Sequence, residues 1–289
     1  DCFMCAKSAE HLIRDLPALS SLPAVVEELE RALDSGEASM ADLGEIVKKD
    51  TDLTARLLRL ANSSFYGFPK GVETVAEALA LIGIEQMKQL LTGSSVMEYF
   101  HNIPSEAVNM RSFWKHSIAT GIAAKVLAVQ RKAPDPELYF VAGLIHDIGR
   151  LVFYLRMPEE AARVLDCYSR NPDIPLYEYE KQSYGFDHGE VAGELLKKWD
   201  FPNSLIHAVK YHHRPALAEV YYTHAAVISV ADFIVHGLDF GNSGETFVPP
   251  ISADTWDRLD LPMSALRNTI KETSSQFEDT VGLFLRNAS

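Results

Sequence analysis

The residues of this sequence best suited to chemistry are ten histidines, eight of which lie after residue 110. His146 is followed by Asp147, and apolar residues flank the pair on both sides within the segment 142–150. This setting places the pair in or beside the core, where a charged carboxylate needs a cation or several hydrogen-bond donors. A second carboxylate, Asp232, lies in the apolar segment 225–235. Its burial is equally costly, unless Asp232 is an ordinary core residue that accepts hydrogen bonds from its neighbours.

Further imidazoles extend this set along the chain, at His116, His188 and the adjacent pair His212-His213. Four or more imidazoles together with two carboxylates suit a borderline divalent ion such as Fe, Mn, Ni, Co or Zn. A carboxylate can also bridge two ions, because it offers two oxygens. The residues fall on at least five predicted helices, which is how helical bundles build metal sites in their cores. The sequence therefore predicts a site for one or two divalent metal ions.

The adjacent histidines and Arg150 are predicted to have different roles at this site. Adjacent positions on a helix point about 100° apart, so His212 is predicted as a ligand and His213 as a residue that faces the cavity or a substrate phosphate. Arg150 directly follows the His-Asp pair and is a candidate for a bidentate phosphate contact. No function is assigned to the remaining histidines, which are His11, His101, His207, His224 and His236.

The elements that must position these residues are helices. Apolar residues recur at spacings of three and four, and the alternation typical of strands is almost absent, so the sequence predicts an all-α fold. A break near 102–105 separates two halves, and the Gly-, Asn- and Pro-rich segment 237–250 is predicted to be an exposed loop. The predicted helices cover 40–49, 52–61, 75–82, 109–131, 138–144, 158–170, 176–183, 188–198, 203–211, 221–235 and 265–285.

Length, net charge and cysteine content limit the classes of protein to which this sequence can belong. A chain of 289 residues corresponds to about two domains. The formal net charge of −13 argues against DNA or RNA as a partner and against anionic membranes. Three cysteines favour a reducing compartment, and Cys2 and Cys5 are interpreted as part of a frayed terminus rather than a zinc or redox site. No run of 18 apolar residues and no signal peptide is evident, so we expect a cytoplasmic protein.

The order of the candidate ligands resembles the HD superfamily of metal-dependent phosphohydrolases, whose all-helical core holds one or two metals. The resemblance implies that the first ion is held by His116, His146, Asp147 and Asp232. It also implies that Asp147 bridges to a second ion held by His188 and His212, with His213 the less certain member. An inositol-cleaving di-iron oxygenase with the same ligand order is a minor alternative within this resemblance.

The N-terminal half is similar to the HDOD family, a bacterial signalling relative of the HD hydrolases. The similarity lies in the segments 16–29, 49–66 and 75–83, and its most recognisable part is the Leu-Arg-Leu-Ala-Asn-Ser-Ser run that begins at Leu58. Within that run Asn62, Ser63 and Ser64 are interpreted as residues that cap a helix end. We expect these polar residues to be structural rather than catalytic.

The HDOD resemblance covers about 12–235 and implies a multi-helix bundle of the HD/HDOD type. In this arrangement an N-terminal helical part, 1–104, packs on an HD-like metal-binding core with a C-terminal helix, 105–289. Many HDOD members have lost metal ligands and act as noncatalytic modules, whereas this sequence keeps the full set. The resemblance to the HD-GYP branch, which cleaves cyclic di-GMP, is weaker. Arg150 replaces its Lys, and no Gly-Tyr-Pro follows His213.

Two functions follow as expectations from the resemblance. The first is a bacterial signalling protein with a metal-dependent phosphohydrolase site for a nucleotide or phosphodiester, in which Asp147, Arg150 and His213 are the catalytic residues. The alternative is a noncatalytic module that binds a signalling protein or a nucleotide, with a structural or vestigial metal site. An open coordination position would favour hydrolysis, and a closed shell would favour structure.

Overall fold

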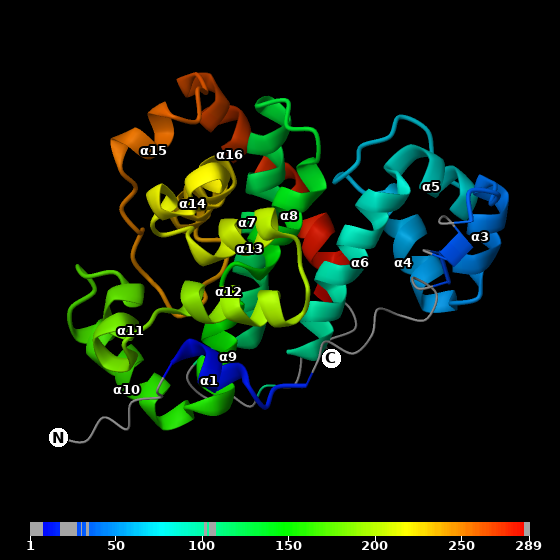
Figure 1. The fold of residues 1–289 in the computed structure, drawn as a ribbon. Coiled ribbons are helices and arrows are strands. Elements are labelled where there is room, and N and C mark those ends of the chain that lie inside the picture. The colour runs from blue at the N-terminus through cyan, green and yellow to red at the C-terminus, as the bar shows by residue number, and fades with distance from the viewer. Residues whose placement is uncertain are drawn as a thin grey trace. The chain divides into compact units, whose positions relative to one another are not determined.

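The structure is a computed structural model that describes residues 8–17, 28–29, 31–32, 35–100, 103 and 108–285. Cys2, Cys5, His101 and most of the predicted break at 102–105 lie outside these residues. Helices dominate the described chain, and no strand occurs in it (Figure 1). The predicted all-α class is therefore confirmed.

The chain divides into two compact units. Unit 1 contains the described residues of Asp1–Ala18 and Phe100–Thr273, and unit 2 contains those of Leu19–Tyr99 and Ser274–Ser289. The division in the middle of the chain falls at Tyr99 and Phe100.

Unit 2 is built from short amphipathic helices whose ends are marked by capping residues. Its helices are α3 (Met40–Lys48), α4 (Thr51–Ala61), α5 (Val75–Ile82) and α6 (Ile84–Tyr99), and the end of α16 is assigned to it. The Ser39 side chain accepts a hydrogen bond from the Asp42 N–H in a capping box, and the Thr74 side chain accepts one from the Glu77 N–H at the start of α5. The predicted starts after Ser39 and Thr74 are thus confirmed, because these caps depend on local sequence alone.

Asn62 closes the end of α4 onto the chain that follows it. Its Nδ2 donates to the carbonyl oxygens of Leu58 and Val72, both at 2.8 Å, and its Oδ1 accepts from the Val72 N–H at 2.8 Å. Both backbone groups of Val72 therefore have their partner in one side chain. The bond to the Leu58 carbonyl agrees with the predicted role of Asn62 at the helix end, whereas its two bonds to Val72 were not predicted.

Replacing Asn62 with alanine is expected to lower the free energy of unfolding by about 1–2 kcal/mol, because the two backbone groups of Val72 lose their partner. Ser63→Ala is the control, since the Ser63 hydroxyl makes a hydrogen bond only to the Leu60 carbonyl among the bonds described, and we expect about 0.5 kcal/mol there. Urea unfolding followed by circular dichroism measures both. Equal losses would contradict the bracing role of Asn62.

Unit 1 contains the long central helices. Figure 1 shows α7, α8, α13 and α14 gathered in the middle of this unit, with α10 and α11 at its edge. Its elements are α1 (Ala9–Ile13), α7 (Met110–Gln130), α8 (Pro136–Ile145), α9 (Ile148–Arg156), α10 (Pro158–Arg170), α11 (Leu176–Tyr184), α12 (His188–Lys198), α13 (Asn203–Lys210), η1 (Pro215–Tyr221), α14 (Tyr222–Leu238), α15 (Ala253–Asp257) and the first part of α16 (Met263–Leu285). The helix predicted over 109–131 is α7, with Asn109 as its N-cap.

Glycines let the helices of unit 1 approach one another unusually closely. A Cβ on Gly143 of α8 would lie 2.7 Å from the Gly121 Cα of α7. A Cβ on Gly149 of α9 would lie 2.0 Å from the carbonyl oxygen of His188, the first residue of α12. Such distances leave no room for any side chain. Gly149 therefore sets how near the chain after Asp147 comes to His188.

The segment Pro136–Arg156 is long and apolar enough to pass as a membrane span by length and composition. However, 89% of its apolar window is buried inside the protein. This burial is typical of core helices, and the segment supplies α8 and α9 to the core of unit 1.

The loop after α14 differs from its prediction. Helix α14 ends at Leu238 and an irregular segment follows, but Ser243 and Glu245 within it are buried, at 0% and 1% exposure. Pro249 is buried as well, so the predicted exposure of the segment 237–250 is wrong at Pro249 and at these two residues. Ser243 and Glu245 are polar, and their side chains contact Arg150 in the core, which a composition rich in Gly, Asn and Pro does not reveal.

Candidate metal centre

One group of predicted ligands meets where α7, α14 and the α8–α9 junction come together. His116 lies on α7 and Asp232 on α14, and His146 and Asp147 form the junction between α8 and α9. All four side chains are buried. His146 is the residue that ends α8, and Asp147 is the residue that precedes α9. Two consecutive polar side chains can therefore both lie in the interior at this junction.

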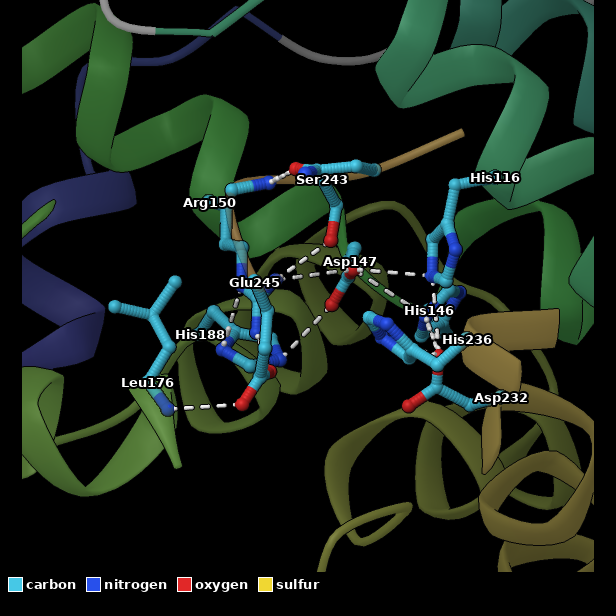
Figure 2. A network of polar contacts seen from close by, with 12 residues as sticks. His116, His146, Asp147, Arg150, Leu176, His188, Asp232, His236, Ser243 and Glu245 are labelled. Atoms are coloured by element: carbon cyan, nitrogen blue, oxygen red, sulfur yellow. Dashed lines mark hydrogen bonds and ion pairs between the residues drawn. The ribbon is translucent and has the colours of Figure 1, made fainter. Parts of the chain in front are cut away.

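The distances within this group are those of a compact polar cluster (Figure 2). The His116 Nε2 lies 3.0 Å from Asp232 Oδ1 and 3.9 Å from Asp147 Oδ2. The His146 Nε2 lies 3.3 Å from Asp147 Oδ2 and 3.5 Å from Asp232 Oδ1. His146 Nδ1 contacts the Gly143 carbonyl oxygen at 2.7 Å, which fixes the ring with Nε2 toward the carboxylates.

A second group gathers around His188 at the start of α12. The His188 Nε2 lies 3.0 Å from Asp147 Oδ1, 3.3 Å from His212 Nε2 and 3.0 Å from His213 Nε2. Helix α13 ends at Lys210, so His212 and His213 belong to a turn. The separation of about 100° expected for helical neighbours does not apply to this turn, and both imidazoles reach His188. His213 is half-buried, and its ring stacks on Tyr177.

Asp147 lies between the two groups, as Figure 2 shows. Its Oδ2 faces His116 and His146, whereas its Oδ1 faces His188. This is the arrangement that a carboxylate bridging two cations requires. The structure thus brings together all the residues predicted as metal ligands, including both members of the pair His212-His213.

The structure places Arg150 behind Asp147, deep in the protein and only 1% exposed. Its Nη1 lies 3.4 Å from Asp147 Oδ2 and donates to Ser243 Oγ at 2.6 Å. Its Nη2 donates to Glu245 Oε2 at 2.9 Å, and its Nε lies 3.5 Å from Glu180 Oε1. The guanidinium is therefore held by carboxylates of the protein itself. Its three nitrogens already have protein partners, so they are not open to the bidentate phosphate contact predicted for Arg150 from the sequence.

Three residues that lie next to the candidate ligands were not predicted from the sequence to belong to the site. Glu180 Oε2 lies 2.6 Å from His188 Nδ1, and it also accepts from the His188 N–H. Glu245 joins Arg150 to the Leu176 N–H. His236 Nε2 lies 3.3 Å from Asp232 Oδ1. Only His236 carried a readable signal, because it follows Asp232 by four residues on the same helix.

The comparison with known families gives one clear result. The sequence matches the HDOD domain over residues 19–215, more than half of the chain. The chain belongs to the HDOD family. The predicted resemblance is therefore confirmed, and the all-helical architecture agrees with it.

Solved structures agree with the HDOD fold. An HDOD domain protein of unknown function from Geobacter sulfurreducens has 20% identity and a TM-score of 0.72, with 95% of both chains covered. A candidate phosphohydrolase from Shewanella amazonensis has 22% identity and a TM-score of 0.71, covering 96% of this chain and 98% of that one. At these identities the likeness shows the fold alone.

A curated sequence relative extends well beyond the HDOD chain described here. It is an uncharacterized protein of Treponema pallidum that is 24% identical over 277 residues, which is 94% of this chain. The chain spans about half, 52%, of the length of that relative.

The pKa values of the histidines in the HDOD centre are shifted by burial and by the neighbouring carboxylates. Burial lowers the pKa of His116 to about 4 and that of His212 to about 3. Burial opposes the charged form of His146 as well, but the Asp147 and Asp232 carboxylates together outweigh it and raise the pKa of His146 to about 10. Glu180 and Asp147 together likewise outweigh burial at His188 and raise its pKa to about 9. The carboxylates are thus compensated by protonated imidazoles when no other cation is bound.

The buried ring nitrogens and carboxylate oxygens of this centre are chemically suited to hold a divalent metal ion. His146 Nε2, Asp147 Oδ1 and Asp232 Oδ1 are buried without a well-directed hydrogen bond, as are both ring nitrogens of His116. Buried polar atoms of this kind are rare in proteins, and a bound ion would satisfy them. The ligand atoms of His116, His146 and Asp147 lie within 4.8 Å of one another, and those of His188, His212 and His213 form a second such group. Imidazole and carboxylate together suit the borderline divalent ions that were predicted.

Proposed function

We propose that this HDOD chain is a metal-dependent phosphohydrolase that acts on a nucleotide or another phosphodiester. The observation that carries the proposal is the position of Asp147, whose two oxygens face two separate groups of imidazoles. The first ion would be held by His116, His146, Asp147 and Asp232. The second would be held by Asp147, His188 and His212, with His213 beside them.

Divalent ions at this centre would polarise a phosphoryl oxygen and make water a stronger nucleophile near neutral pH. The residues of the chain have complementary parts. Arg150 and Glu180 hold Asp147 and His188 in place through the contacts described above. His213 is half-buried at the edge of the centre and stacked on Tyr177. Burial and the neighbouring His212 hold its pKa well below the usual value, so the neutral imidazole is suited to bind a substrate phosphate or to accept a proton.

The name of the Shewanella relative as a candidate phosphohydrolase supports the same reaction class. The proposed setting is the bacterial cytoplasm, where the protein would act in signalling. A signalling protein is a further proposed partner, and neither DNA or RNA nor a membrane is proposed as one.

The direct test combines metal analysis with a substrate screen of the wild-type protein. We expect bound Fe, Mn, Ni, Co or Zn by elemental analysis, and metal-dependent release of product from a panel of nucleotides, cyclic dinucleotides and a chromogenic phosphodiester. Bound metal without hydrolysis of any member of the panel would favour the noncatalytic signalling module. Absence of bound metal after reconstitution with these ions would overturn the metal centre itself.

Metal binding at pH 7.5 is expected to release about two protons per chain, since ligand nitrogens must be deprotonated. His146 and His188 carry protons at this pH in the ion-free protein, because their pKa values are raised to about 10 and about 9. Apparent affinity should therefore rise as pH rises from 6 toward 9. Calorimetry in two buffers of different ionisation enthalpy counts the protons. A binding enthalpy that is independent of the buffer would contradict this expectation.

A further inference from the structure

His236 lies one helical turn beyond Asp232 on α14, so the two side chains project from the same face of the helix. The His236 side chain is 6% exposed, although its neighbour Gly237 faces solvent. Figure 2 shows His236 beside Asp232 and His146, on the side of the centre that faces α7. The imidazole is thus directed into the core and toward the first group of ligands.

Three imidazoles converge on one oxygen of Asp232. The Nε2 atoms of His116, His236 and His146 lie 3.0, 3.3 and 3.5 Å from Asp232 Oδ1, respectively. The ligand atoms of His116, Asp232 and His236 all lie within 4.8 Å of one another. The rings of His116 and His236 are 4.6 Å apart between centroids.

Hydrogen bonds and ion pairs from the imidazoles to Asp232 account for this convergence only in part. A carboxylate oxygen has about two lone pairs with which to accept, so it cannot accept well from three imidazoles at once. Asp232 Oδ1 in fact makes no well-directed hydrogen bond, although it is buried. Several imidazole nitrogens that lie close to one carboxylate oxygen without good hydrogen-bond geometry are typical of ligands that surround a cation.

We propose that His236 is a ligand of the ion at His116 and Asp232. This inference rests on the proposed metal centre and adds a residue to it. The first ion would then have protein ligands from His116, His146, Asp147, Asp232 and His236. These five fill most of the about six positions of an octahedral ion.

The two proposed sites are therefore unequal. The first is nearly closed by protein, as expected for an ion with a structural part. The second has fewer protein ligands and is bordered by the half-buried His213. Consequently a phosphate-containing substrate would bind at the ion near His188, His212 and His213.

The His236→Gln variant tests whether His236 binds the metal ion itself or only holds Asp232 in place. The glutamine amide can still donate a hydrogen bond to Asp232, but it is a poor ligand for these ions. We expect the variant to lose the first ion, or to bind it at least about tenfold more weakly, as measured by metal content and titration with zinc. The control is His224→Gln, because His224 lies on the same helix but stacks on Tyr139, outside the ligand groups. It should keep wild-type metal binding.

Histidine nitrogen NMR of the zinc-loaded wild-type protein and of the His236→Gln variant gives a second measurement, and circular dichroism establishes that the variant is folded. A zinc-bound Nε2 signal that disappears in His236→Gln is expected. If the wild-type protein binds metal and His236→Gln retains both its metal content and its affinity, His236 is not a ligand, although the proposed centre stands. If the wild-type protein binds no metal at all, both proposals fail.

Discussion

Replacing Asp147 with alanine is expected to leave the protein with almost no bound metal. Asp147 is the residue whose oxygens face both groups of imidazoles, at 3.3 Å from His146 and 3.0 Å from His188. Its loss therefore removes a ligand from each proposed ion at once. Arg150 keeps its contacts with Glu180 and Glu245 but loses the carboxylate between it and the ligand groups, so its positive charge opposes cations there. Elemental analysis of the purified variant measures the effect, and its circular dichroism spectrum establishes that the fold is retained.

Two further variants sharpen this experiment. His188→Ala should lose the second ion but keep the first, because His188 contacts only the Oδ1 side of Asp147. His207→Ala is the control, since His207 of α13 packs against Tyr211 and Tyr221, away from the ligand groups. Full metal content in the Asp147 variant would show that the site has been assigned to the wrong residues.

Replacing Gly149 with alanine is expected to lower the free energy of unfolding by about 3 kcal/mol. The new Cβ would lie 2.0 Å from the His188 carbonyl oxygen, and a backbone atom cannot swing aside as the end of a flexible side chain can. The strain can be relieved only by moving α9 away from the start of α12. Such a shift would also draw Asp147 away from His188, so metal affinity should fall with stability.

Gly237→Ala is the matched control for this substitution. Gly237 is also helical, but nothing lies within 4 Å of the position where its Cβ would be. Since alanine favours the helix over glycine, we expect a gain of up to about 1 kcal/mol there. Chemical denaturation of the two variants and the wild-type protein provides the comparison. A Gly149 variant as stable as the wild type would mean that α9 and α12 are less closely packed than described.

The parts of the fold that the sequence predicted are those determined locally. Ser39 and Thr74 mark the starts of their helices because an N-cap side chain bonds to a backbone N–H three residues away. His146 and Asp147 stood out because charged and polar residues inside an apolar run must be compensated. For the same reason Asp232 was recognised within α14.

The parts that were missed depend on contacts between distant segments. Glu245 is separated from Arg150 by 95 residues, and nothing in a Gly- and Asn-rich segment indicates that it folds back into the core. Glu180 lies on a polar helix, where a carboxylate usually faces solvent. The choice between His212 and His213 assumed a continuous helix, whereas α13 ends at Lys210 and the turn brings both rings to His188.

The burial of Glu245 has a consequence for where this domain can be cut. The HDOD match ends at residue 215, yet Asp232 and Glu245 lie beyond it. A fragment trimmed to the matched region would expose the apolar faces that α14 covers and would leave the Arg150 guanidinium without its carboxylate from that segment. The smallest piece of this chain that is worth expressing for metal studies therefore extends past Glu245, well outside the boundary that sequence similarity alone would choose.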